Sequence, residues 1–235
     1  MYKDPSGHKA CDNADDSGCV TYTADYMLHQ FGITAQGMSE EDKWVIYDSA
    51  RHSGRKFMNL PGNDAESPEE AFKKTHRPII IIVTNTPIPQ KGNCRVNTNI
   101  ITCHQPPNIK TTLHEFGHVF GNYYWKKTKN NPDENKRYLA SDYISDDFMY
   151  TSDGYKCGNQ KGCVSHPYSQ EGYDRTEEFA NMYENWMLDG TNINLADGGF
   201  DDSYLGGHRR MWMNSDPIWY PEGGMIWFLT NMGLM

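Results

Sequence analysis

The sequence predicts an α+β fold in which a small mixed sheet packs with amphipathic helices. Three observations lead to this prediction. Residues 79–83 form a short apolar run typical of a strand, whereas residues 108–120 and 176–188 repeat apolar side chains at helical spacing. A chain of 235 residues can bury a full core, and nothing in its composition requires a division. We therefore expect a single domain over residues 1–235, with residues 1–20 as a surface arm.

The overall charge limits the partners that the chain is expected to bind. It has 22 Lys and Arg residues against 31 Asp and Glu residues, which gives a net charge of -9 at pH 7. Nucleic acids and anionic membranes both attract basic surfaces. No apolar run approaches the roughly 18 residues that a membrane-spanning helix needs. We therefore expect that the chain binds neither nucleic acid nor membrane. A monomer is expected.

The six cysteines fall into three close pairs, which predicts disulfides. An even number of cysteines in local pairs is typical of chains that fold in an oxidising compartment. The competing interpretation is a cysteine-rich metal site, but no pair has the two-residue gap of a zinc knuckle. We therefore expect a secreted, extracellular protein. The expected pairs are Cys11 with Cys19, Cys94 with Cys103, and Cys157 with Cys163.

Helix-start signals stand out in the first third of the chain. Ser39 with Asp42 three residues later resembles a capping box. Ser67 followed by Pro68 combines an N-cap serine with a proline at the first helical position. The helices expected in this region cover residues 21–31, 39–52 and 67 to about 76.

Residues 79–83 and 94–103 are expected to form the sheet. The first segment is a continuous run of β-branched residues, so we expect a strand buried on both faces. The second has the pattern of a hairpin with its turn at residues 98–99. Since the hairpin lies just before the helix expected at residues 108–120, it is a candidate edge strand for an extended peptide. This register pairs Cys94 with Cys103 and Val96 with Ile101 on one face.

The metal-binding motif is the stretch His114-Glu115-Phe116-Gly117-His118, an HExxH sequence. Two histidines four residues apart project from one face of a helix and can bind a single Zn²⁺ ion. The glutamate beside the first histidine reaches a metal-bound water without binding the metal, so Glu115 is the candidate general base. Asn108 can cap this helix. The alternative interpretation is an ordinary amphipathic helix.

Two histidines leave zinc short of the three protein ligands of a catalytic site, so a third ligand must be found. One candidate arrangement is metzincin-like. Residues 114–121 match HExxHxxG, and Phe148-Met149-Tyr150 resembles a Met-turn. The third histidine of that pattern is replaced here by Tyr124, and neutral tyrosine is a poor zinc ligand.

The other candidate for the third ligand is Glu177, in the helix expected at residues 176–188. The Glu-x-Phe-Ala core of this helix resembles the ligand helix of gluzincin metallopeptidases. The anthrax lethal factor-like branch of that clan is closer still, since it shares HEFGH and has a Tyr-x-Arg-Thr stretch similar to Tyr173-Asp174-Arg175-Thr176. The resemblance implies a zincin-like metallopeptidase domain with His114, His118 and Glu177 as zinc ligands and Tyr173 as the group that stabilises the oxyanion.

These features together predict a secreted zinc-dependent endopeptidase that acts on a protein or peptide substrate. Helix spacing places Glu177 on one side with Asn181 and Glu184, which favours Glu177 over Glu178 as the ligand. A plainer interpretation of Glu177 is a first-turn acid that stabilises the helix dipole. Two other functions stay open, a non-catalytic zinc-binding or toxin module and a metal-dependent hydrolase of a non-peptide bond.

Other histidines are candidates for lesser roles. His104, His166 and His208 are expected to be solvated or structural. His166 or His208 is also a candidate second donor to an oxyanion.

Overall fold

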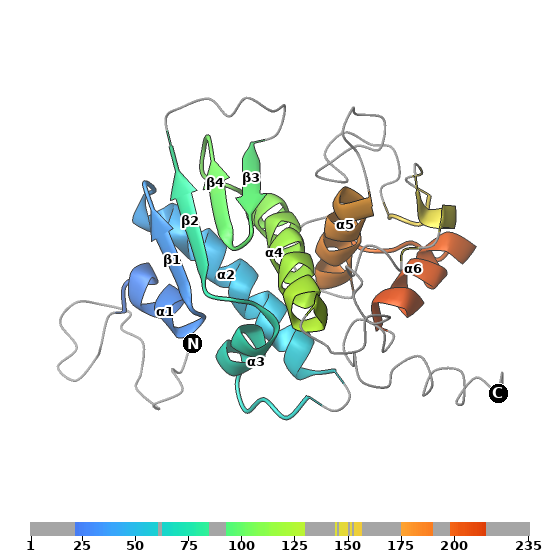
Figure 1. Cartoon of the computed structure of the whole chain (residues 1–235), viewed down its shortest axis with the longest axis horizontal. Helices are drawn as coiled ribbons and strands as arrows, with labels where there is room; N and C mark the ends of the chain where they lie inside the picture. Colours follow the sequence, from blue (N-terminus) through green and yellow to red (C-terminus); the bar gives the residue numbers. More distant parts are fainter. Residues whose placement is uncertain are drawn as a thin grey trace.

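The structure is a computed structural model that describes residues 22–60, 63–84, 93–129, 144, 146–149, 151, 153–156, 175–189 and 198–214, with side chains in α4 described as far as residue 122. Its elements confirm the expected α+β class (Figure 1). The helices are α1 (Ala24–Gln30), α2 (Glu40–Met58), α3 (Pro68–Thr75), α4 (Ile109–Lys129), α5 (Arg175–Leu188) and α6 (Tyr204–Asn214), with a 3-10 turn at Asp146–Phe148. The strands are β1 (Ile33–Gln36), β2 (Ile79–Val83), β3 (Cys94–Asn97) and β4 (Ile100–Cys103).

The sheet is small and mixed, as expected. Its strand order is β1-β2-β4-β3, with β1, β2 and β4 parallel and β3 antiparallel to β4. β3 therefore forms an edge of the sheet, and it lies against α4 (Figure 1). The predicted hairpin register is confirmed, since Cys94 pairs with Cys103 and Val96 with Ile101. The Cys94–Cys103 disulfide is present.

The central strand β2 differs from its prediction. A strand buried on both faces was expected, but only Ile79 and Ile81 are buried, whereas Ile80 and Ile82 are half-buried. The buried pair belongs to the same core as apolar residues of α2 and α4. The helices thus cover one face of this strand more fully than the other, which a local run of isoleucines does not reveal.

The first helices begin at the residues that their capping signals predict. Ser39 and Asp42 form the expected capping box at the start of α2. Ser67 caps α3 by accepting from Glu70 N at 3.2 Å. α2 continues past the expected end at residue 52 to Met58, because Phe57 in its last turn packs into the core.

Two elements were not expected, β1 and α6. β1 is a short parallel strand beside β2, and α6 contains the adjacent glycines Gly206 and Gly207, which lower helix propensity. The buried side chains of Arg209 and Met213 anchor α6. The expected arm at residues 1–20 and the expected pairs Cys11–Cys19 and Cys157–Cys163 lie outside the described residues. No helix in the described part of the chain is long and apolar enough to cross a membrane.

Candidate metal centre

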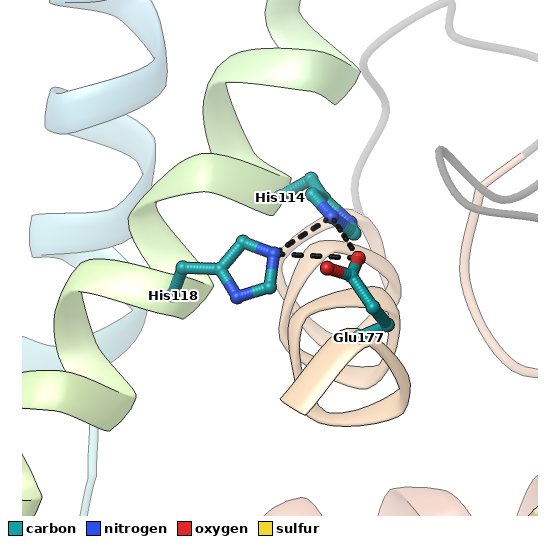
Figure 2. Close-up of side chains that lie close together, drawn as sticks. All are labelled: His114, His118 and Glu177. Carbon is teal, nitrogen blue, oxygen red and sulfur yellow. Dashed lines mark hydrogen bonds and ion pairs between the residues drawn. The ribbon is translucent and has the colours of Figure 1, made fainter. Parts of the chain in front are cut away.

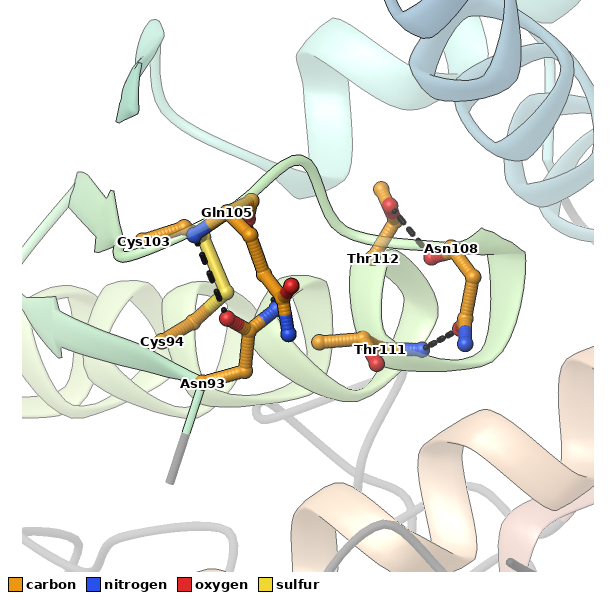
Figure 3. Close-up of a disulfide and its surroundings, with 7 residues drawn as sticks. All are labelled: Asn93, Cys94, Cys103, Gln105, Asn108, Thr111 and Thr112. Atoms are coloured by element: carbon orange, nitrogen blue, oxygen red, sulfur yellow. Dashed lines mark hydrogen bonds between the residues drawn. A yellow bond between two sulfur atoms is a disulfide. The ribbon is translucent and has the colours of Figure 1, made fainter. Parts of the chain in front are cut away.

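The segment that leads into the motif helix is held at both of its ends (Figure 3). Gln105 N donates to Asn93 Oδ1 and Asn93 Nδ2 donates to Gln105 O, each at 3.3 Å. The Cys94–Cys103 disulfide joins β3 to β4 beside this pair of hydrogen bonds. Asn108 caps α4 as expected, because its Oδ1 accepts from the backbone N–H three residues later at 2.9 Å. The start of α4 is thereby tied to the sheet edge.

Two histidines of α4 and one acid of α5 converge on a single point (Figure 2). The Nε2 atoms of His114 and His118 lie 3.2 Å apart. Glu177 Oε2 lies 3.3 Å from His114 Nε2 and 3.4 Å from His118 Nε2. His114 is buried, whereas His118 and Glu177 are half-buried, so the group opens toward solvent on one side. The structure thus brings together the three residues that the sequence proposes as metal ligands.

The dimensions of this triangle suit a zinc ion. Ligand atoms about 2.0–2.1 Å from a tetrahedral zinc ion stand about 3.3 Å apart, which matches the three donor distances. Imidazole nitrogen and carboxylate oxygen are both donors that zinc takes. Among the described residues, this is the one group of three His, Cys, Asp or Glu side chains that could hold a metal ion.

A glycine inside the motif allows the two ligand helices to approach. A Cβ atom built on Gly117 would lie 2.9 Å from Ala180 Cα and 3.0 Å from Tyr183 Cβ, both on α5. Those distances are shorter than carbon–carbon contacts of about 3.5–4.0 Å. Only glycine therefore permits the present separation of α4 and α5, which sets the distance between the histidines and Glu177.

The two neighbouring acids at the start of α5 face different partners. Burial opposes ionisation of Glu177, but hydrogen bonds from His114 and His118 outweigh it and hold the pKa of this carboxyl below its usual range. Glu178 is fully buried on another side, where it contacts the Arg209 guanidinium and accepts from the Tyr155 hydroxyl at 2.9 Å. Of these two neighbouring acids, only Glu177 reaches the histidines, as helix spacing predicts.

Glu115 stands apart from the triangle of donor atoms. Its side chain is buried, with 7% of the residue exposed. Burial raises the pKa of Glu115 to about 7, while the nearby His118 lowers it and Glu177 raises it. The Glu115 carboxyl is thus close enough to His118 and Glu177 for them to shift its pKa, although it is not one of the three candidate ligands.

The other candidate residues either lie outside the described residues or are not part of the group of three. Tyr173, His166 and Tyr150 lie outside the described residues, as does the side chain of Tyr124. His104 is exposed after β4. His208 lies on α6 with its ring 5.1 Å from that of Phe148, the first residue of the possible Met-turn.

Sequence reasoning missed the roles of two buried residues near the centre. Glu184 Oε2 lies 3.8 Å from His114 Nδ1, and only its position seven residues after Glu177 signalled that it faces α4. Arg209 is fully buried and donates to the carbonyl oxygens of Phe148 and Thr151 at 3.0 Å each. No local pattern marks an arginine in a glycine-rich stretch as a core residue.

Comparison of the chain with protein-family models, with curated proteins and with solved structures finds no match in any of the three. The assignment of this centre therefore depends on its own geometry and on the motif.

Proposed function

We propose that the protein is a secreted zinc-dependent endopeptidase that holds one Zn²⁺ ion through His114, His118 and Glu177. The observation that carries the proposal is the triangle of two imidazole nitrogens and one carboxylate oxygen with sides of 3.2, 3.3 and 3.4 Å. Three protein ligands leave one position of a tetrahedral ion for water or substrate, as in catalytic rather than structural zinc sites.

The ligand set favours the gluzincin type over the metzincin type. Glu177 comes from a second helix and lies within 3.4 Å of both motif histidines. A metzincin would place its third ligand after the motif, where this chain has Tyr124. The set therefore supports the resemblance to gluzincins, and to the anthrax lethal factor-like branch, that the HEFGH motif suggests.

The chemistry that we propose assigns a proton-transfer role to Glu115. A bound zinc ion supplies Lewis-acid chemistry, which activates water and polarises a carbonyl group. The Glu115 carboxylate accepts a proton from the attacking water and returns it to the nitrogen of the leaving amine. Its place in the motif, next to one ligand and outside the donor triangle, supports this role. Tyr173 is proposed as the donor that stabilises the oxyanion.

A peptide substrate would bind along β3. This strand is antiparallel to its neighbour, forms the edge of the described sheet and lies against the motif helix. An extended peptide can add to such an edge by main-chain hydrogen bonds. The Cys94–Cys103 disulfide and the Asn93–Gln105 hydrogen bonds fix one end of this strand. The same disulfide supports an oxidising, extracellular location.

The test combines metal analysis with cleavage of a denatured protein. The parent should contain one zinc ion per chain and lose cleavage when a chelator removes it. Glu115→Gln should retain zinc, while its cleavage rate falls by about 100-fold or more, since it lacks only the base. Glu41→Gln, an exposed acid of α2, is the matched control and should cleave like the parent.

Three outcomes would count against the proposal in different ways. A parent protein that does not bind one zinc ion per chain would refute the proposed metal centre. Zinc-loaded parent protein without cleavage would favour the non-catalytic module. A Glu115→Gln variant that cleaves at the parental rate would refute the role of Glu115.

A further inference from the structure

We infer that Glu184 is a positioning residue of the metal centre, whose carboxylate accepts a hydrogen bond from Nδ1 of His114 and so directs Nε2 of that ring toward the ion. The inference rests on the metal-binding part of the proposed function. It assigns to a buried residue of α5 a role that the HExxH motif does not contain.

The geometry places the two nitrogens of His114 opposite two acids of one helix. Glu177 Oε2 lies 3.3 Å from Nε2, and Glu184 Oε2 lies 3.8 Å from Nδ1. The two acids are seven residues apart, so they lie on the same side of α5 and about 10 Å apart along its axis. The imidazole ring of His114 thus lies lengthwise along α5, between the two carboxylates.

Burial makes the interaction between Glu184 and His114 important for stability. The side chain of Glu184 is 0% exposed and that of His114 is 3% exposed. A carboxylate and an imidazole N–H so far from water are both costly unless they interact with polar groups. The separation of 3.8 Å is within ion-pair range and exceeds hydrogen-bond length by somewhat less than 1 Å, so the proposed hydrogen bond requires a small movement of one of the two side chains.

A fixed proton on Nδ1 has a direct consequence for metal binding. A neutral imidazole carries its proton on one nitrogen and coordinates a metal through the other. A carboxylate beside Nδ1 favours the form with the proton there, and Nε2 is then ready to bind. Groups of this kind behind a ligating histidine typically change metal affinity by about 10–100-fold when they are removed.

Glu178 provides a matched comparison for Glu184, because the two are the same type of residue. Both are fully buried and both belong to α5. Glu178 faces Arg209 and Tyr155, whereas Glu184 faces His114. A change of Glu178 to Gln therefore reports the effect of neutralising a buried acid of this helix that faces Arg209 and not His114.

The experiment measures zinc affinity by competition with a chelator, using protein shown to be folded by circular dichroism. Glu184→Leu, which keeps the volume and removes the acceptor, should weaken zinc binding by about 10–100-fold, and Glu184→Gln by less. The absorption bands of the Co²⁺-substituted Glu184→Leu protein should also shift, because the His114 ring is no longer held. Glu178→Gln should stay within about threefold of the parent in zinc affinity.

Equal zinc affinity in the parent and both Glu184 variants would overturn the inference, as would a loss of affinity in Glu178→Gln as large as that in Glu184→Gln. A second measurement is the tautomer of His114 in metal-free Glu177→Leu, which lacks the acid 3.3 Å from Nε2, read from its ¹⁵N chemical shifts. A proton on Nδ1 supports the inference, and a proton on Nε2 overturns it. A parent that binds zinc but cleaves no peptide would refute the proposed peptidase activity and leave this inference standing, whereas a parent that binds no zinc would refute both.

Discussion

Replacing Gly117 by alanine should disturb both the fold and the metal centre, because the added methyl group has no room between α4 and α5. It would lie 2.9 Å from Ala180 Cα and 3.0 Å from Tyr183 Cβ. Carbon atoms in contact prefer about 3.5–4.0 Å, so the two helices must separate by roughly 0.5–1 Å. Ala180 offers backbone and not a flexible side-chain end at this point, so the strain cannot be relieved by a rotamer change.

The expected size of the effect follows from two opposing terms. Overpacking of a core typically costs about 1–3 kcal/mol. Alanine in place of glycine in a helix interior gains about 1 kcal/mol. Gly121, one turn later, separates the two terms, because a Cβ there would lie 3.5 Å from the Phe179 ring, an ordinary contact. We therefore expect Gly121→Ala to be neutral or stabilising and Gly117→Ala to be about 1–3 kcal/mol less stable than Gly121→Ala.

Urea unfolding of the metal-free proteins measures the stability term, and chelator competition measures the metal term. Binding sites need their groups within about 0.5 Å of the productive geometry, so the separation of α4 from α5 should weaken zinc binding by about tenfold or more in Gly117→Ala only. If Gly117→Ala is as stable as Gly121→Ala and binds zinc equally well, the close approach of these helices does not set the ligand distances.

Three further predictions concern the framework around the centre. Arg209→Met should lower the free energy of unfolding by about 3–5 kcal/mol, because it leaves the Glu178 carboxyl buried without its cation. If this variant unfolds in urea like the parent, the ion pair does not contribute to stability. Burial lowers the pKa of His76 to about 3, below the value of about 6.5 in the unfolded chain. Between these two pH values the unfolded chain binds more protons than the folded protein. The free energy of unfolding should therefore fall by up to about 1.4 kcal/mol for each pH unit below 6.5 in this range. His76→Gln should show a shallower loss in the same acid titration of metal-free protein, and an identical slope would refute the assignment. Serine at both Cys94 and Cys103 should cost about 2–3 kcal/mol, the scale for so short a loop, and unchanged urea unfolding would argue that the disulfide contributes nothing to stability.

The local parts of the centre were predictable from the sequence. His114 and His118 project together because four residues make about one helical turn, and this holds wherever the helix packs. The caps of α2 and α3 and the register of the cysteine hairpin also depend on residues close in sequence. The prediction of Glu177 required more information, because this residue lies on another helix. It depended on a family resemblance together with helix periodicity.

Long-range partners were not predictable in this way. Arg209 is buried because Glu178 and the carbonyl oxygens around Phe148 surround it, and none of them is near in sequence. The glycines that precede it in α6 lower helix propensity, which hid the helix. Ile80 and Ile82 are chemically identical to their buried neighbours, so only the placement of the helices could show which face of β2 is covered.

The span of chain between the ligands has a consequence for unfolding that the centre itself does not show. His118 and Glu177 are about 60 residues apart, so the proposed ion would act as a cross-link in the unfolded chain for as long as it stayed bound to both. By the chain-entropy argument used for disulfides, closing a loop of this length removes about 4 kcal/mol of unfolded-state entropy. The hairpin disulfide, whose cysteines are 9 residues apart, constrains a far smaller loop. Loss of the proposed ion would therefore lower the free energy of unfolding by up to about this amount, so that cleavage of the protein by other proteases should become faster.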